Sequence, residues 1–283
     1  GWWKNGYPQY FGKSINAVRM MGLRVTIDGE PIDLAKCAHT DYYRELDMQT
    51  GVTLRTFTVQ TARGSAAVRV ERFVSLAQKE LLAVSYAVRP DHAARVEMRP
   101  YLDARVHNLD SNYQETFWEM LAEEETEDAI GLLTKTKDNP FGTPRFAVGV
   151  AMSCWADELD LTERLRDEGY VEFCYAGDVP AGATASVEKY ALCFTSRDHA
   201  ENMLLTMALK AASRARETGF EEHRAAHSAA WRARWDGCDV SIQGDDRAQQ
   251  GIRFNLFQLL STYSGEDARL NIGPKGFTGE KYG

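Results

Sequence analysis

The stretch Val52–Val59, VTLRTFTV, decides the fold of this chain, because apolar and polar residues alternate along it. Alternation of period two is typical of a β-strand with one buried face. The signature recurs in AVRVERFV (67–74) and LLAVSYAV (81–88), and in shorter runs at 23–28, 96–102, 147–152 and 187–194. Turn residues punctuate the runs at Gly51, 63–65, 90–91 and 139–140. From Val18 to about Phe194 the chain is therefore predicted to be mainly β, a large antiparallel sandwich.

The hydrophobic period changes after Phe194, and a helical region is predicted there. Asp198 is a candidate N-cap for a helix that carries Met203, Leu204, Leu205, Leu209 and Ala212, and Gly219 ends that helix. A second helix runs to about Trp235, and its residues His227, Trp231 and Trp235 share one face. That face is either an aromatic platform for a sugar or the side that packs on the sandwich.

A short strand is predicted at Asp239–Ile242, and Asp245 or Asp246 can cap a third helix. Ile252, Leu256, Leu259 and Tyr263 fall on one face of that helix, with Phe254, Phe257 and Leu260 beside it. So wide an apolar arc predicts burial against more than one neighbour, one of which can lie beyond Gly283. The glycine-rich tail 270–283 is predicted to be an irregular loop of the kind that lines sites.

Composition excludes several classes of function. The 283 residues carry 33 basic and 41 acidic side chains, a net charge of −8, and this acidity disfavours a nucleic-acid partner. No apolar run is long enough to span a bilayer and no signal peptide is visible, so no membrane partner is expected. The five cysteines are widely spaced without a C-x-x-C pair, so we expect no metal site, free thiols and a cytoplasmic location.

Three short motifs invite functional interpretations that their spacing does not support. Gly12-Lys13-Ser14 lacks the four-residue spacing of a phosphate-binding loop, and the glycines at 273, 276 and 279 lack dinucleotide-binding spacing. Six carboxylates lie between Glu119 and Asp128. Without interleaved glycines they indicate a solvated hairpin tip rather than a cation site.

Four stretches resemble the maltose phosphorylase branch of glycoside hydrolase family 65. They are GWWKNGYP (1–8), YRELDMQTG (43–51), DDRAQQGIRFN (245–255) and RLNIGPKGFTGEKYG (269–283). Residues 43–51 resemble a turn between strands of that family, residues 245–255 its linker helix, and residues 269–283 the loop that opens its catalytic domain. The Gly-Pro-Lys-Gly-Phe form of this loop favours the maltose branch, because kojibiose and trehalose phosphorylases are more similar to Pro-Ala-Lys/Arg-Gly-Leu there.

The resemblance implies an N-terminal super-β-sandwich, a helical linker and an (α/α)6 catalytic barrel. On this chain it implies a sandwich domain at 1–197, a helical linker at 198–265 and the first loop of the barrel at 266–283. Because the sequence starts without Met and stops within a family phrase, we expect a fragment that lacks both ends. Family members often form homodimers, so a homodimer is also expected.

The implied reaction is inverting phosphorolysis of an α-linked glucose disaccharide, with maltose and phosphate giving β-glucose 1-phosphate and glucose. The leaving oxygen needs a general acid, normally a carboxyl group. Phosphate is itself the nucleophile and co-substrate, so no other cofactor is expected. The family's general acid Glu and its Tyr-Trp-Asp-Thr-Glu phrase are expected beyond Gly283, and no catalytic residue is assigned. Lys275, Glu280 and Tyr282 are the candidates for substrate contact, or alternatively hold the domain junction.

Other functions remain open from the sequence. A free-standing carbohydrate-binding sandwich would use aromatic residues such as Trp2, Trp3, Trp118, Trp155, Tyr42 and Tyr43 for sugar stacking. A scaffold or dimerisation domain is compatible with the phosphorylase interpretation. A related α-glucoside hydrolase, or a kojibiose, trehalose or nigerose type of phosphorylase, would differ in the missing barrel.

Overall fold

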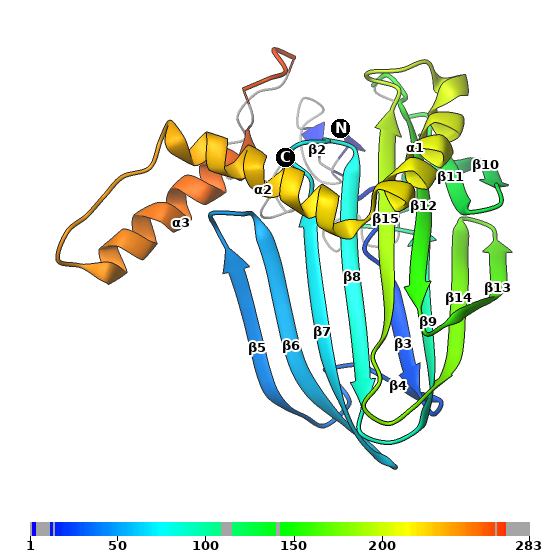
Figure 1. Cartoon of the computed structure of the whole chain (residues 1–283). Coiled ribbons are helices and arrows are strands. Elements are labelled where there is room, and N and C mark those ends of the chain that lie inside the picture. The colour runs from blue at the N-terminus through cyan, green and yellow to red at the C-terminus, as the bar shows by residue number, and fades with distance from the viewer. Residues whose placement is uncertain are drawn as a thin grey trace.

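The protein is two antiparallel β-sheets packed face to face, with helices on the outer side of the larger sheet (Figure 1). This architecture is seen in a computed structural model, which describes residues 15–108, 115–139, 142–263 and 265–269. It also gives the backbone of strands β1 (Trp2–Trp3) and β2 (Gly12–Lys13), which pair with each other. The predicted mainly β sandwich is confirmed.

The large sheet has eight strands in the order β10-β11-β12-β15-β8-β7-β6-β5. Their bounds are β5 (His39–Asp47), β6 (Val52–Thr61), β7 (Gly64–Val74), β8 (Leu81–Pro90), β10 (Trp118–Glu125), β11 (Ala129–Thr136), β12 (Ala147–Asp157) and β15 (Ala185–Thr195). Neighbouring strands pair antiparallel throughout. The acidic stretch forms β10 and the tight β10–β11 turn, as the hairpin interpretation predicted.

The small sheet has five strands in the order β13-β14-β9-β3-β4. Their bounds are β3 (Leu23–Ile27), β4 (Glu30–Pro31), β9 (Ala94–Asp103), β13 (Asp160–Asp167) and β14 (Tyr170–Val179). The main core lies between the two sheets, where alternate residues such as Val68, Val96 and Val187 are almost fully buried. Burial of one side chain in two is the physical origin of the period-two pattern.

Three helices follow the sandwich, with bounds α1 (Leu204–Thr218), α2 (Phe220–Asp236) and α3 (Asp246–Thr262), after the short 3-10 turn η1 (Glu201–Met203). Helix α1 buries Leu204, Ala208 and Ala212 against β11, β12 and β15. Gly149 lets α1 approach closely, because a Cβ there would lie 2.8 Å from Leu204. In the described residues no helix is both long and apolar enough to cross a membrane.

Two local predictions are wrong. Asp198 does not cap a helix, because α1 begins only at Leu204 and the Asp198 carboxylate is held by Lys79 and Arg269 instead. Residues 239–242 form no strand and pair with no strand of the described chain. The Gln249 side chain hydrogen-bonds to the main chain of this segment instead: it accepts from Ile242 N–H and donates to the main-chain oxygen of Val240. A side-chain partner thus replaces the ladder that alternation had predicted.

Helix α3 begins as predicted but is less buried. The Asp245 side chain accepts a hydrogen bond from Ala248 N–H at 3.0 Å and caps the helix. Only Phe257 is buried, by packing on α2, whereas Phe254 and Leu259 are 48% and 65% exposed. Helix α2 therefore covers only part of the apolar face of α3. No second element among the described residues packs on the rest of that face.

Candidate functional site

The predicted substrate-contacting residues Lys275, Glu280 and Tyr282 lie outside the described residues. The structure does describe where their loop starts, at the end of residues 265–269. A groove of about 1100 Å³ lies there, between the segment after β15 and the segment that leads to Leu270. We call it the junction groove. It is lined by 75–76, 79, 144–146, 195–198, 234 and 266–269.

Arg269 is the central residue of the junction groove. Its guanidinium pairs with Asp198 at 2.5 Å and with Asp267 at 2.6 Å, and it donates to the main-chain oxygen of Arg197 at 2.9 Å. Lys79 reaches Asp198 from the other side at 3.3 Å. The hydrogen bond from Arg269, and to a smaller extent that from Lys79, lowers the pKa of Asp198. The start of the tail is thus tied to the end of β15 by charge-assisted hydrogen bonds.

Arg234 of α2 makes a second connection to the same segment. It donates to the main-chain oxygen of Leu260 at 3.1 Å and pairs with Glu266 at 3.1 Å. The guanidiniums of Arg234 and Arg269 are therefore both bound to groups of the chain itself. The described part of the junction groove is accordingly a structural junction that positions the tail, and nothing in it has the geometry of a nucleophile with its base.

The aromatic face of α2 packs on the sandwich instead of presenting a sugar platform. His227, Trp231 and Trp235 are 1%, 5% and 8% exposed. Trp235 Nε1 donates to the main-chain oxygen of Met48 at 2.7 Å, and the Trp231 ring stacks on Phe257 of α3 with centroids 4.6 Å apart. The packing interpretation is confirmed and the platform interpretation is wrong.

His227 fixes α2 to the loop after β7. Its Nδ1 accepts a hydrogen bond from Leu76 N–H at 2.9 Å, and its ring stacks on Phe73 at 4.7 Å. Burial lowers the pKa of His227, so the neutral form, which can accept, is favoured. The turn in YRELDMQTG (43–51), which follows β5, lies against this aromatic face through Met48 and Gly51.

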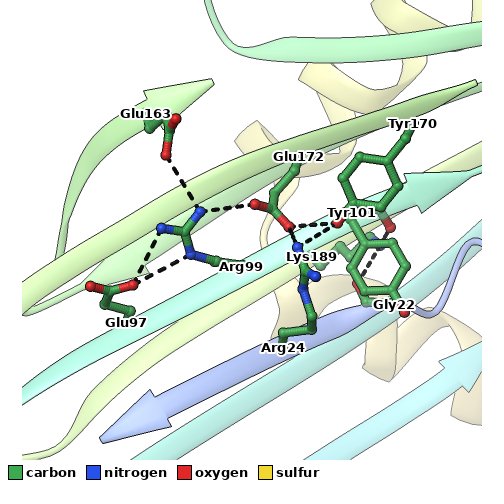
Figure 2. A network of polar contacts seen from close by, with 9 residues as sticks. All are labelled: Gly22, Arg24, Glu97, Arg99, Tyr101, Glu163, Tyr170, Glu172 and Lys189. Atoms are coloured by element: carbon green, nitrogen blue, oxygen red, sulfur yellow. Dashed lines mark hydrogen bonds and ion pairs between the residues drawn. The ribbon is translucent and has the colours of Figure 1, made fainter. Parts of the chain in front are cut away.

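Sequence reasoning did not find the polar network of Figure 2, which lies on the face of the small sheet that points away from the core and is joined from the large sheet by Lys189. The Glu172 carboxylate is 1% exposed and is held by Arg24, by Arg99 at 3.0 Å and by the Tyr170 hydroxyl at 2.6 Å. Lys189, on β15, is fully buried and donates to the main-chain oxygens of Gly22 and Tyr101. Burial lowers the pKa of Lys189 to about 7.

The network is structural by its geometry. Each oxygen of Glu172 already has a donor, and the Tyr101 and Tyr170 rings stack against each other at 5.3 Å. Arg99 is further engaged by Glu97 and Glu163. Both carboxylate oxygens of Glu172 are therefore already engaged by donors of the chain itself. Among the described residues no cluster of three His, Cys, Asp or Glu side chains could hold a metal ion.

Comparison with known proteins adds an independent line of evidence. The family model of the glycosyl hydrolase family 65 N-terminal domain matches residues 1–234, and that of the family 65 central catalytic domain matches residues 253–283. The second match begins within α3, the helix whose apolar arc is only partly covered.

Curated relatives agree with these matches. Maltose phosphorylase of Bacillus subtilis is 45% identical over 284 residues, which is 100% of this chain and 37% of that protein. The α,α-trehalose phosphorylase of Thermoanaerobacter brockii is 27% identical over 98% of the chain and 37% of its own length. The chain thus spans somewhat over a third of these relatives.

A solved structure described as a putative kojibiose phosphorylase from human microbiome has the same fold. It superposes with a TM-score of 0.85, covering 96% of this chain and 36% of that one at 22% identity. At this identity the likeness supports the sandwich-and-helix architecture alone.

Proposed function

The chain belongs to glycosyl hydrolase family 65, and from this membership we propose that it is the non-catalytic N-terminal and linker part of an inverting disaccharide phosphorylase that acts on maltose. The observation that carries the proposal is the 45% identity to a maltose phosphorylase along the whole chain. Identity to trehalose and kojibiose phosphorylases is 27%. The Gly-Pro-Lys-Gly-Phe form of residues 273–277 favours the same branch.

In the proposed reaction a phosphate oxygen attacks the anomeric carbon from the face opposite the leaving glucose. The C–O glycosidic bond breaks as a general acid protonates its oxygen, so α-linked maltose gives β-glucose 1-phosphate and free glucose. The general acid is a glutamate of the catalytic barrel, beyond Gly283. Phosphate is a co-substrate, and no other cofactor takes part.

This chain's part in that reaction is positioning. Arg269 and Arg234 tie the segment at 265–269 to β15 and α2, so the loop that carries Lys275, Glu280 and Tyr282 starts from a fixed place. We propose that these three side chains contact the disaccharide or phosphate. Lys275 would attract phosphate as a point charge. A homodimer and a cytoplasmic location belong to the same proposal, and the five free thiols suit a reducing compartment.

The test uses the chain alone and joined to a catalytic domain. The chain alone, incubated with maltose and phosphate, is expected to release no glucose 1-phosphate. A chimera in which it replaces the aligned part of the Bacillus subtilis enzyme is expected to release glucose 1-phosphate and glucose in equal amounts. Turnover by the chain alone would refute the non-catalytic role, and glucose without glucose 1-phosphate from the native full-length enzyme would indicate a hydrolase.

Sugar binding by the sandwich itself needs a separate measurement. Trp155 is 43% exposed whereas Trp118 is buried, so Trp155 is the described tryptophan that could report a bound sugar. Titration of the chain with maltose is expected to leave tryptophan fluorescence unchanged. Saturation at millimolar maltose or below would instead support a carbohydrate-binding module.

A further inference from the structure

A groove of about 770 Å³ lies between the two sheets beside β3 and β4, and we call it the intersheet groove. The small sheet and the segment after β4 contribute residues 23–26, 31–34 and 99 to its lining. The large sheet contributes Arg55, Phe57 and Tyr86. Arg55 and Phe57 belong to β6, which lies next to the edge strand β5 (Figure 1). One wall of the groove is therefore the inner face of the large sheet near its edge.

Three arginines lie on three neighbouring strands at this wall. Arg55 of β6 lines the groove, and Arg44 of β5 is directly opposite it in the strand register. Arg72 of β7 is opposite Thr53, which lies on the same face of β6 as Arg55. That face points between the sheets, because Phe57 continues it into the core. We call these three arginines the arginine cluster.

The arginine cluster has no anionic partner within the described part of the chain. None of its side chains makes an ion pair or a hydrogen bond with a described residue, and Arg55 Nε is buried without a partner there. The Arg55 guanidinium lies against the Phe57 ring, with Cζ 5.6 Å from the ring centroid. Burial, and then the charges of Arg55 and Arg44, lower the pKa of Arg72. The three charges are thus close enough to act on one another.

The other charged groups that line the groove are already paired. Arg24 and Arg99 both bind the Glu172 carboxylate. Asp33, in the segment after β4, pairs with Lys36 at 3.2 Å. The arginine cluster is therefore an excess of positive charge that the carboxylate lining the groove does not offset.

Positive charge gathered in this way is unfavourable unless an anion joins it. Like charges directly opposite each other on neighbouring strands are destabilising. A buried donor without a partner loses its hydration without compensation. An anion that accepts hydrogen bonds from the guanidiniums would remove both costs. The arginine cluster therefore has the chemistry of an anion-binding site.

A phosphate group fits the arginine cluster better than a carboxylate does. Three guanidiniums, each with its N–H donors in a planar fork, offer more donors than the two oxygens of a carboxylate can accept. A phosphate group on an organic molecule carries a charge of about −1.5 to −2 at neutral pH and three strong acceptor oxygens. The groove is also larger than a phosphate ion, and its apolar lining at Leu23, Phe57 and Tyr86 can contact an organic group attached to the phosphate.

We propose that the arginine cluster binds a phosphate dianion at the wall of the intersheet groove, either as inorganic phosphate or as the phosphate group of a small ester such as a sugar phosphate. The proposal rests on the unpaired guanidiniums of the sandwich, and it stands whether or not the complete protein is a phosphorylase. If the complete protein is a maltose phosphorylase, its co-substrate and its sugar phosphate product both carry this group.

The direct test is isothermal titration calorimetry of the 283-residue chain in Tris chloride at fixed ionic strength, with inorganic phosphate and with β-glucose 1-phosphate. We expect saturable binding to the parent. Binding should weaken about tenfold in Arg55→Gln and in Arg44→Gln, which each lose one charge-assisted contact. Arg89→Gln is the matched control and should bind as the parent does. It removes an exposed arginine of the same sheet, on the outer face of β8, that is likewise unpaired among the described residues.

Comparison of the two ligands identifies the source of the phosphate. Tighter binding of β-glucose 1-phosphate than of inorganic phosphate, with no binding of glucose itself, would assign the apolar lining to the organic part of an ester. Equal or weaker binding of β-glucose 1-phosphate would assign the arginine cluster to free phosphate. Acetate, which presents a carboxylate, should bind about tenfold more weakly than phosphate.

Three results would overturn the proposal. They are the absence of saturable binding to the parent, binding that Arg55→Gln and Arg44→Gln leave unchanged, and acetate that binds as tightly as phosphate.

Thermal unfolding distinguishes loss of the site from loss of the fold. Arg44 is exposed, and its removal relieves the repulsion with Arg55, so phosphate-free Arg44→Gln should unfold at no lower a temperature than Arg89→Gln. Phosphate should raise the Tm of the parent more than that of Arg44→Gln. A lower Tm for phosphate-free Arg44→Gln, or an equal rise with phosphate in the parent and in Arg44→Gln, would contradict the proposed site.

Discussion

Lys189 and Gly22 connect the two sheets through one hydrogen bond, in which the Lys189 ammonium or amine donates to the Gly22 main-chain oxygen at 2.9 Å. The same Nζ donates to Tyr101 at 2.6 Å. A fully buried lysine with two carbonyl partners and no paired carboxylate is stabilised mainly as the neutral amine. Lys189 thus links β15 to the small sheet by hydrogen bonds, while its burial makes the charged form of its own side chain unfavourable.

Lys189 should make stability depend on pH. Its pKa is about 7 in the folded chain and near its ordinary value of 10.5 in the unfolded chain. The unfolded state therefore binds one more proton between these values, and stability rises with pH across that window by about 1.4 kcal/mol per unit from this group. Below pH 7 the penalty is fully present. In Lys189→Met the slope of urea-unfolding free energy between pH 7 and 8.5 should be smaller by that amount, whereas the exposed Lys210→Met should keep the parent slope.

Glu172 should be a strong stabilising residue despite lying among charges. In Glu172→Gln the guanidiniums of Arg24 and Arg99 lose their buried carboxylate, although Arg24, being 58% exposed, can turn to water. We expect a loss of about 1–3 kcal/mol in the free energy of unfolding. Glu168→Gln, on the exposed β13–β14 turn, is the control and should change it little. Equal stabilities of the two variants would mean that the network of Figure 2 contributes nothing net.

Gly51 should be required where the turn after β5 meets α2. Its φ is +70°, and a Cβ there would lie 2.1 Å from Trp231 Nε1. Gly29 has φ +81° with nothing within 4 Å of its Cβ position, so Gly29→Ala incurs only the backbone penalty, about 1–2 kcal/mol. Gly51→Ala should lose about 1–3 kcal/mol more, from overpacking. Comparing the free energies of unfolding of the two variants by chemical denaturation isolates the effect of the Trp231 contact. Equal losses of stability in Gly51→Ala and Gly29→Ala would refute this prediction.

The sequence predicted those strands that bury alternate side chains. Runs such as 67–74 and 81–88 lie in the middle of the large sheet, and their alternation reflects one face against the core and one against helix or solvent. Strands β5 and β13 were not identified as strands, because as edge strands they expose nearly every residue and carry no pattern of burial. Tyr43–Asp47, interpreted as part of a turn, is the second half of β5.

The buried polar residues could not be predicted for a different reason. Glu172 and Lys189 sit within strand patterns that are ordinary in sequence, and their partners come from strands distant along the chain. Only the pairing of β3, β9 and β14 within the small sheet shows that Arg24 and Arg99 converge on one carboxylate. The same holds for Asp198, which resembles a helix cap in sequence but is bound by Arg269, 71 residues away.

Arg269 should control how firmly the tail is attached without controlling global stability. Its partners Asp198 and Asp267 have lowered pKa values because Arg269 donates to them, so the attachment is present at neutral pH and weakens as pH falls through those lowered values. All three groups face solvent, and exposed pairs contribute little to unfolding free energy. In Arg269→Gln we expect an unchanged Tm but faster amide hydrogen exchange at 196–198 and 265–269. Arg247→Gln, exposed on α3, should leave that exchange as in the parent. Unchanged exchange at both segments in Arg269→Gln would show that the connection through Arg234 to Leu260 suffices to hold the start of the tail.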